Sequence, residues 1–162
     1  MTDAQIVVTG EELVGRGHRG FEPVVQEMIE GARSEVQLVA FVFTPAAIGL
    51  LDMVGGLADR GVQVTIVVNR LEKLKPEVKT WLKEAPRRWR SVKIGNFSSG
   101  GKRELHAKLC VVDRKRAVVG SANFTWGGLV SNYEVGVELH GESAWKLAVL
   151  VDELLAMCST KA

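Results

Sequence analysis

Residues 35–68 read EVQLVAFVFTPAAIGLLDMVGGLADRGVQVTIVV, and the fold class follows from them. Both ends of this stretch, residues 35–43 and 62–68, are nearly continuous apolar runs rich in Val and Ile, which is typical of strands buried on both faces. Between them, Pro45 opens a helix that continues to about Arg60 and that Gly61 ends. A strand, a helix and a strand with short connections predict a right-handed crossover and a parallel pair at the centre of a sheet.

Shorter patterns on both sides extend this unit. A charged turn at residues 114–116 separates two β-rich runs and predicts a hairpin. The whole pattern predicts an α/β fold in which helices flank a central mixed sheet. The further strands are expected at residues 5–9, 92–97, 105–113, 117–123 and 133–139, and the further helices at residues 21–32, 77–84 and 144–157.

Length and composition predict one globular domain over residues 1–162, with 46% apolar and 25% charged residues. A domain of this size buries roughly 70% of the surface that its unfolded chain exposes, so it can fold without disulfides or a structural metal. Cys110 and Cys158 have no zinc-ligand spacing and suggest no disulfide framework. The longest apolar run is too short to span a membrane, and the polar residues 1–5 do not resemble a signal peptide. We therefore expect a cytoplasmic protein without a membrane span.

Charge is distributed unevenly along the chain. Residues 70–116 contain 15 Lys and Arg against 5 Asp and Glu, a net charge of +10, whereas the remainder carries −8, which gives the overall +2. Such a basic segment is typical of a surface that meets a polyanion, because clustered cations release the counterions of a phosphate backbone. A solvated surface that serves solubility is the alternative, and charge alone does not separate the two.

Within the basic segment, two clusters are the candidate nucleic-acid contacts. The first is Arg87, Arg88, Trp89 and Arg90, and the second is Lys102 and Arg103 in a tract at residues 98–103 that we expect to be flexible. A Trp89 ring that stacks on an unpaired base contributes about 1 to 3 kcal/mol. The alternative is that this ring covers the edge of the core, and the sequence leaves both interpretations open.

Four polar residues of the predicted hairpin form a candidate catalytic set. His106 and Lys108 are two apart on one strand, so their side chains emerge on one face roughly 6 to 7 Å apart, and Ser121 and Asn123 share a face for the same reason. Pairing across the turn brings the four together. A lysine, a hydroxyl and an amide can bind phosphate, and an imidazole can act as nucleophile or proton donor near neutral pH. The set needs no metal or other cofactor.

These residues occur in a pattern that resembles the HKD signature of the phospholipase D superfamily. Upstream, residues 36–44 and 60–68 are similar to the first two core strands of the short bacterial nucleases of that superfamily, so the resemblance covers most of the chain from about Phe21 onward. Residues 71–103 do not match in detail. The motif reads His106-Ala107-Lys108, four residues, Asp113, six residues and Gly120-Ser121-Ala122-Asn123, followed by Asn123-Phe124-Thr125 and Asn132-Tyr133-Glu134.

The resemblance implies a phospholipase D-like α-β-α sandwich and a role for each matching residue. His106 would attack phosphorus to give a phosphohistidine, while its symmetry mate protonates the leaving oxygen. Lys108 and Asn123, supported by the Ser121 hydroxyl, would bind the non-bridging oxygens as charge develops. Glu134 would accept a hydrogen bond from the other ring nitrogen of the histidine, as an orienting carboxylate does. An ordinary exposed carboxylate is the alternative for Glu134.

Two further expectations concern the motif as a whole. Asp113 completes the motif but sits at the mouth of a turn, so we expect it to support the hairpin and Lys108 rather than to touch substrate. The family normally uses two motifs per active site and this chain has one. We therefore expect a twofold homodimer in which the two copies of His106 face each other across one shared site.

The sequence thus predicts a metal-independent phosphodiesterase, an endonuclease acting on DNA or RNA. One alternative is phospholipid hydrolysis, which the basic segment and the lack of an apolar membrane-docking helix disfavour. A second alternative is a catalytically silent nucleic-acid-binding subunit of a larger defence or repair complex. The complete set of His106, Lys108, Asn123 and Glu134 argues against that alternative.

Overall fold

The computed structural model describes residues 4–98 and 102–158. Residues 1–3 of the polar start and residues 99–101 of the expected flexible tract therefore lie outside the description. The strands are β1 Gln5–Thr9, β2 Arg19–Gly20, β3 Glu35–Ala40, β4 Gln63–Asn69, β5 Val92–Phe97, β6 Leu109–Val112, β7 Arg116–Gly120 and β8 Glu134–His140. The helices are α1 Glu11–Val14, α2 Phe21–Glu30, α3 Ile48–Asp59, α4 Pro76–Arg88 and α5 Glu142–Met157. There are also the single 3-10 turns η1 Pro45–Ala47 and η2 Leu71–Lys73, and a short π-helix, η3 Gly127–Ser131.

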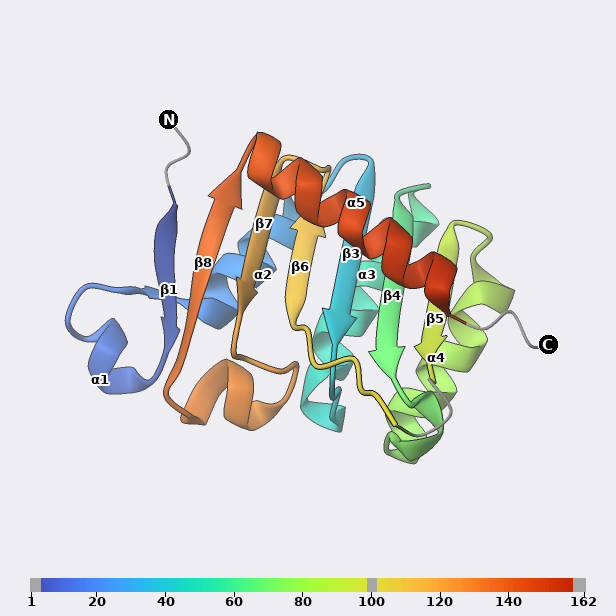
Figure 1. Ribbon diagram of the computed structural model, residues 1–162, viewed down its shortest axis with the longest axis horizontal. Helices are drawn as coiled ribbons and strands as arrows, with labels where there is room; N and C mark the ends of the chain where they lie inside the picture. Colours follow the sequence, from blue (N-terminus) through green and yellow to red (C-terminus); the bar gives the residue numbers. More distant parts are fainter. Residues whose placement is uncertain (1–3, 99–101, 159–162) are drawn as a thin grey trace.

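The strands form one mixed sheet of eight in the order β2-β1-β8-β7-β6-β3-β4-β5. Helix α5 crosses one face of this sheet, and α2, α3 and α4 cover the other (Figure 1). The expected α/β sandwich with a central mixed sheet is therefore confirmed. β3, β4 and β5 are parallel, as the apolar runs predicted, whereas β6, β7 and β8 pair antiparallel. The carboxyl ends of the three parallel strands consequently lie at one edge of the sheet, which we call the carboxyl edge.

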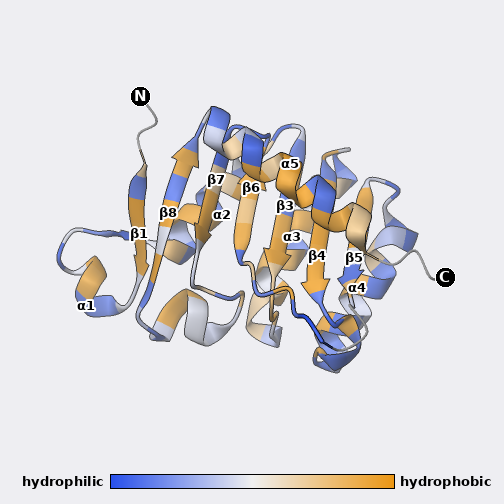
Figure 2. Cartoon of the chain, viewed as in Figure 1, coloured by the Kyte–Doolittle hydropathy of each residue, from blue (hydrophilic) through white to orange (hydrophobic). Residues whose placement is uncertain are grey.

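The core has one hydrophobic layer on each side of the sheet, and apolar residues of the strands lie between the helices (Figure 2). Leu51, Val54 and Leu57 of α3 are fully buried on one face, as are Ala144, Ala148 and Val151 of α5 on the other. The small residues of α5 let the helix axis approach the strands closely. Burial raises the pKa of the Cys110 thiol to about 12, so this group stays protonated and packs as a small apolar side chain. Across the described residues, no helix combines the length and apolar character needed to cross a bilayer.

The hairpin strands are shorter than the sequence pattern predicted. β6 starts at Leu109 rather than at residue 105, and β7 ends at Gly120 rather than at residue 123. The amide N–H of Leu105 donates instead to the side-chain Oδ1 of Asn69 at 2.9 Å, which draws the chain away from β7 towards β4. The polar residues of the motif therefore sit in loops just beyond the strand ends, and strict strand alternation does not govern them.

β3 also ends early, at Ala40, because the following residues pair with a different part of the chain. The N–H of Thr44 donates to the carbonyl of Phe124 at 3.1 Å, and the rings of Phe43 and Phe124 stack with centroids 4.9 Å apart. This contact holds the end of β3 beside the chain that leaves β7. Residues 41–44 are thereby brought into the neighbourhood of the motif.

Candidate active site

The polar residues of the motif converge at the carboxyl edge because three neighbouring strands end or begin there. His106 and Lys108 precede β6, Ser121 and Asn123 follow β7, and Glu134 is the first residue of β8. Backbone bonds continue the sheet to the site: the N–H of Gly120 donates to the carbonyl of Lys108 at 3.3 Å. The predicted convergence of the first four side chains thus has a structural cause in the β6-β7-β8 order of the sheet.

His106 and Lys108 form the centre of the site. Nζ of Lys108 lies 2.8 Å from Nδ1 of His106 and donates to the His106 carbonyl at 2.6 Å. His106 itself is exposed, as a group that meets a substrate must be, whereas Lys108 is only 6% exposed. Among the described residues no carboxylate forms a salt bridge with Lys108. A cation this buried without a counter-ion is an attractive partner for an anion that enters from solvent.

The surroundings of Lys108 affect its charge. Burial lowers the pKa of Lys108 below the ordinary value of a lysine, and the negative charge of Glu134 offsets part of that effect. The ring of Phe41 forms a wall beside both residues, with its centroid 4.6 Å from that of His106 and 5.9 Å from Nζ of Lys108. An aromatic wall of this kind strengthens electrostatic interactions by keeping water out.

Asn123 is fixed by backbone contacts that the sequence did not reveal. Its Oδ1 accepts a hydrogen bond from the N–H of Val42 at 3.2 Å, which fixes the orientation of the amide. The two hydrogen-bond donors of the side chain are on Nδ2. A Cβ on Gly128 would lie 2.2 Å from the carbonyl oxygen of Asn123, so only glycine allows η3 to pack against this backbone. Thr9 in turn donates to the carbonyl of Gly128 at 2.7 Å. Asn123 is therefore held from two sides with its amide nitrogen available to a ligand.

Ser121 and Glu134 form a hydrogen-bonded pair. The hydroxyl of Ser121 donates to Oε2 of Glu134 and accepts from the N–H of Val135 at 3.2 Å, while Nδ2 of Asn132 donates to Oε1 of Glu134 at 3.3 Å. In this chain the Glu134 carboxylate is thus engaged by Ser121 and Asn132, and the Nδ1 atom of His106 contacts Lys108. The expected hydrogen bond from the imidazole of His106 to the Glu134 carboxylate is therefore not formed in this arrangement and stays a prediction.

Asp113, the third letter of the motif, lies at the other end of β6. Its carboxylate accepts hydrogen bonds from the N–H groups of Arg33, Ser34 and Glu35 at 2.8 to 3.2 Å, and from the Ser34 hydroxyl at 2.8 Å. It therefore ties the hairpin turn to the start of β3. The whole length of β6 separates it from Lys108, so its support reaches the hairpin and not the lysine.

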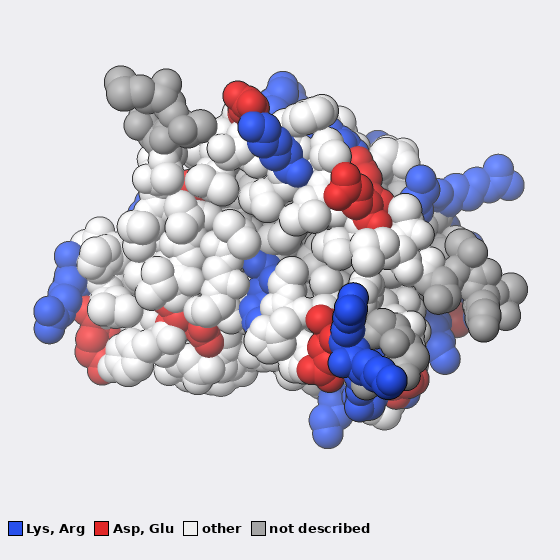
Figure 3. All heavy atoms as spheres, in the orientation of Figure 1, with Lys and Arg blue, Asp and Glu red and all other residues white. Residues whose placement is uncertain are grey.

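The two basic clusters lie at opposite edges of the sheet. Arg87, Arg88, Trp89 and Arg90 precede the first residue of β5 and so lie at the opposite edge from His106, whereas Lys102 and Arg103 follow the carboxyl end of β5. Lys and Arg side chains gather over the carboxyl ends of β4 and β5 (Figure 3). Trp89 donates to Asp59 at 2.6 Å and packs on Gly55 of α3. This placement favours the interpretation of Trp89 as cover for the core edge.

Sequence reasoning missed Phe41, Val42 and Gly128. The first two lie in an apolar run whose pattern predicts one buried strand, and the signal that sets them apart is their position just before the helix-opening Pro45. The need for glycine at position 128 depends on a contact between η3 and Asn123, five residues earlier, and nothing in local pattern marks it. Each of the three acts by positioning a group that the sequence did identify.

The assembled site combines one exposed imidazole with a buried ammonium and an amide donor, which suits an anion with a reactive centre. Two or more donors around a tetrahedral oxyanion stabilise charge that develops on its oxygens. Within the described part of the chain, no group of three or more His, Cys, Asp or Glu residues is arranged to hold a metal ion. The chemistry that these residues can supply themselves is nucleophilic attack and proton transfer at a phosphate.

The chain is similar to known proteins over most of its length. Residues 25–155 match the family model described as "Cardiolipin synthase, PLD-like domain". The DISARM protein DrmC of Bacillus paralicheniformis is 30% identical over 140 residues, which are 83% of this chain and 54% of that protein, so the chain spans about half the length of this relative.

Two solved structures share the whole fold. NucT from Helicobacter pylori superposes with a TM-score of 0.75 at 19% identity, over 98% of both chains. Nuc from Salmonella typhimurium, a phospholipase D family member, gives 0.77 at 18% identity, over 98% of this chain and 97% of that one. Phosphatidylserine synthase of Haemophilus influenzae gives 0.70 at 14% identity, over 97% of this chain but 38% of the other.

Proposed function

Because this chain belongs to the phospholipase D-like family, a family of phosphodiesterases and nucleases, we propose that it cleaves nucleic acid through a phosphohistidine on His106. The observation that carries the proposal is the pair of His106 and Lys108, an exposed nucleophile 2.8 Å from a buried cation without a carboxylate partner among the described residues. The choice of nucleic acid over lipid rests on the basic surface at the carboxyl edge, since a continuous polyanion occupies many cations at once.

In this proposal Lys108 also controls the position of the imidazole proton. An ammonium donates to Nδ1 of His106, so a neutral ring carries its proton on Nε2 in the arrangement described above. A substrate phosphate that attracts Nζ away from the ring releases Nδ1. The exposed ring can then give its Nε2 proton to solvent water and take one from water on Nδ1, where the N–H donates a hydrogen bond to the Glu134 carboxylate. Nε2 then has a free lone pair for attack.

The reaction then proceeds in two displacements. Nε2 of His106 attacks phosphorus, the bond from phosphorus to the leaving oxygen breaks, and the partner subunit's His106 donates its proton to that oxygen. A water molecule next attacks phosphorus and gives a proton back to the same partner imidazole, while the phosphorus–nitrogen bond breaks. Lys108 and Nδ2 of Asn123 hold the non-bridging oxygens in both steps, where negative charge increases.

A homodimer is part of the proposal because one chain supplies one motif imidazole, that of His106, and the reaction needs two. Large apolar side chains are exposed next to the site and support an interface there: Tyr133 and Val135, which flank Glu134, are 66% and 55% exposed, and Ile6 on the neighbouring β1 is 51% exposed. Helix α5 leaves this part of the sheet face uncovered (Figure 1). Burying such a patch against a second copy would remove apolar surface from water.

The test of the proposed activity compares the wild-type protein with His106→Asn in excess chelator. Substrates are single- and double-stranded DNA, RNA and phosphatidylcholine vesicles. We expect wild type to cleave nucleic acid and to form a covalent adduct that survives alkali, and His106→Asn to do neither while keeping the melting temperature. Loss of cleavage on chelation, equal activity in the variant, or hydrolysis of lipid alone would overturn the proposal. Binding of nucleic acid without any cleavage would indicate the silent subunit.

A mixing experiment tests the shared site. When wild type and His106→Asn are co-refolded in varied proportions, activity falls with the square of the wild-type fraction if each site needs two imidazoles. A linear fall would mean that each chain works alone and would remove the homodimer from the mechanism. Analytical ultracentrifugation of each mixture provides the control for assembly.

A further inference from the structure

A second pocket adjoins the proposed active site at the carboxyl edge. Its cavity volume is about 260 Å³, and it lies between the segment after β3, the η2 turn and the chain that leads to His106. The residues that give it its chemistry are Phe41, Thr44, Arg70, Lys73, Lys75 and Glu104. Nothing in the mechanism above uses this pocket.

The pocket shares two residues with the immediate surroundings of the reacting groups. Phe41 lines it and also lies against the imidazole of His106, with ring centroids 4.6 Å apart. Val42 lines it and donates to Asn123 at 3.2 Å. A polymer whose phosphate sits between His106 and Asn123 therefore has this pocket as its immediate neighbour.

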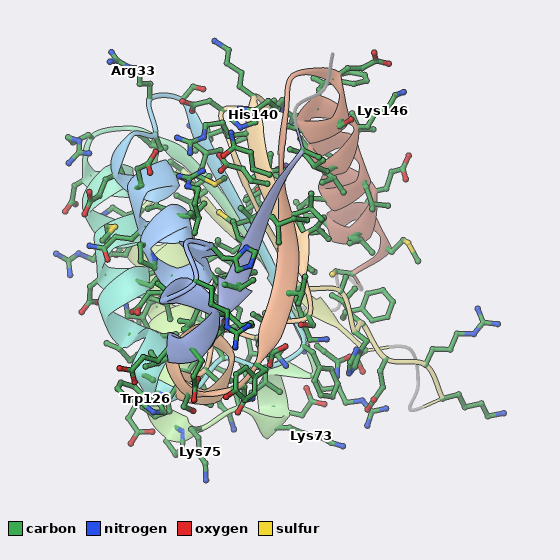
Figure 4. All side chains as sticks on the ribbon, turned by 90° about the vertical axis from the view of Figure 1, so that its left-hand side faces the viewer. Arg33, Lys73, Lys75, Trp126, His140 and Lys146 are labelled. Atoms are coloured by element: carbon green, nitrogen blue, oxygen red, sulfur yellow. The ribbon has the colours of Figure 1, made fainter. Side chains whose placement is uncertain are left out.

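The charge of the pocket suits a phosphate chain. Three cations and one carboxylate line it, and the carboxylate, Glu104, lies 3.7 Å from the Arg70 guanidinium. Lys73 and Lys75 are exposed, and no residue in the described ranges forms an ion pair with either. Both side chains project from the same end of the molecule (Figure 4). Two uncompensated lysines beside an aromatic ring are the combination that single-stranded nucleic acids bind, through phosphate and base respectively.

The η2 turn, which carries Lys73 and precedes Lys75, is held by β5. The N–H of Leu71 donates to Oδ1 of Asn96 at 2.8 Å, and the N–H of Arg70 donates to the carbonyl of Phe97 at 3.1 Å. Arg70 has a φ of 50°, a left-handed conformation that costs free energy in a non-glycine residue and persists only where neighbours enforce it. The backbone that forms this wall of the pocket is thus held in place by β5.

Building on the proposed function, we infer that this pocket receives the nucleoside next to the scissile phosphate of a single-stranded substrate. The base lies along Phe41, and the following phosphate lies between Lys73 and Lys75. A base in a duplex is stacked and paired, so it can enter such a pocket only after it is flipped out. The pocket therefore selects single strands, whether DNA or RNA, over duplexes.

The first test measures binding rather than turnover. Fluorescence anisotropy with a labelled oligothymidylate in chelator compares Lys73→Glu/Lys75→Glu with Arg33→Glu/Lys115→Glu, both in the His106→Asn background. The control pair makes the same change in net charge at exposed positions near the opposite edge. We expect the pocket pair to weaken binding at least about tenfold and the control pair less than about threefold. Equal weakening by the two pairs would overturn the inference.

The second test changes the ligand, so folding of a variant cannot confuse it. An oligomer of equal length and charge in which every base is absent should bind roughly five- to a hundredfold more weakly than oligothymidylate, because stacking is lost. A duplex of the same length should also bind more weakly. Equal affinity for oligothymidylate, the oligomer without bases and the duplex would overturn the inference about the pocket but not the proposed cleavage at His106. If the protein prefers oligothymidylate as expected but cleaves nothing, only the proposed activity is overturned.

Discussion

The two ends of the β6-β7 hairpin differ in what their charged groups do. At the carboxyl edge, Lys108 is buried without a salt bridge to any described residue, and His106 is exposed. At the turn, the Asp113 carboxylate accepts hydrogen bonds from four donors, which are three backbone N–H groups and the Ser34 hydroxyl. Arg114 forms salt bridges with Glu35 and Asp152 at 2.7 and 2.9 Å. One end leaves its charge available to a ligand, and the other uses its charge within the fold.

The same contrast between the charged groups at the two ends extends beyond the hairpin. Lys73, Lys75 and Trp126 lie at one end of the molecule, and Arg33 and His140 lie at the other (Figure 4). At the turn end, the fully buried carboxylate of Glu138 pairs with Arg19 and Arg116 at 2.5 and 2.7 Å, and with His140 at 3.2 Å if that imidazole is protonated. The motif therefore spans the end proposed to be functional and an end that stabilises the fold, and variants at the two ends should differ in their effects on activity and on stability.

Lys108→Met is expected to have the largest effect on activity. If Lys108 donates to the phosphate oxygens as proposed, its removal should lower kcat about 10²- to 10³-fold. The melting temperature should stay the same or rise, because the variant replaces a poorly solvated cation with an apolar side chain of similar length. Steady-state kinetics and calorimetry on the same preparation check both. A large drop in melting temperature with little change in kcat would place Lys108 with the stabilising end.

Asp113→Ala should show the opposite pattern. Loss of the bonds to the Arg33, Ser34 and Glu35 amides should destabilise the fold by roughly 2 to 4 kcal/mol, or about 5 to 12 °C in melting temperature, with kcat nearly unchanged below the transition. Asp113→Asn is the matched control, since asparagine tolerates the φ of 52° and retains one acceptor oxygen. The Asp113→Asn variant should lose about half as much stability as Asp113→Ala. A fall in kcat of the folded variant as large as that for Lys108→Met would contradict the comparison.

The pH dependence of stability gives the same residue a second test. Burial tends to raise the pKa of Asp113, but the hydrogen bonds from Glu35, Ser34 and Arg33 outweigh it and lower the pKa below its ordinary value. The carboxylate therefore stabilises the fold above the unfolded-state pKa of about 4, and this contribution is lost as the pH falls through the lower folded value. Denaturant titrations should show that the difference in free energy of unfolding between wild type and Asp113→Ala becomes smaller below about pH 4. A constant difference would show that charge is not the cause.

Lys108→Arg tests the charge at the functional end. Burial lowers the pKa of Lys108, so the ammonium is lost at a lower pH than for an ordinary lysine, and activity that needs it should fall early on the alkaline side. Arginine stays protonated throughout this range. Its residual activity should therefore persist to higher pH than that of wild type, as profiles of kcat against pH would show. If kcat fell at the same alkaline pH in wild type and in Lys108→Arg, a group other than Lys108 would be the cause of that fall.

The sequence allowed the parallel unit and the hairpin to be predicted because hydrophobic periodicity reports burial directly. It located His106, Lys108, Ser121 and Asn123 because short spacing across a tight turn constrains where residues meet. It placed Asp113 at the mouth of the turn, but the expected support of Lys108 was wrong, because Asp113 binds the start of β3 and the length of β6 separates it from the lysine. Nor did it find the Phe41 wall, because a contact between β3 and the β6 loop depends on the order of strands in the sheet, which periodicity does not encode.

The smallest expected effect separates the two basic clusters. Lys102→Ala/Arg103→Ala removes charges that follow β5 near the active site, so it should weaken binding of oligothymidylate several-fold and reduce the slope of log affinity against log salt by about 1.4. Arg87→Ala/Arg90→Ala makes the same change in charge before β5, at the opposite edge, and should leave that slope unchanged. Arg87 already pairs with Glu84 at 2.8 Å within α4. Titrations at several salt concentrations compare the pairs, and equal slopes for both would mean that the polyanion is bound over both edges rather than along the carboxyl edge.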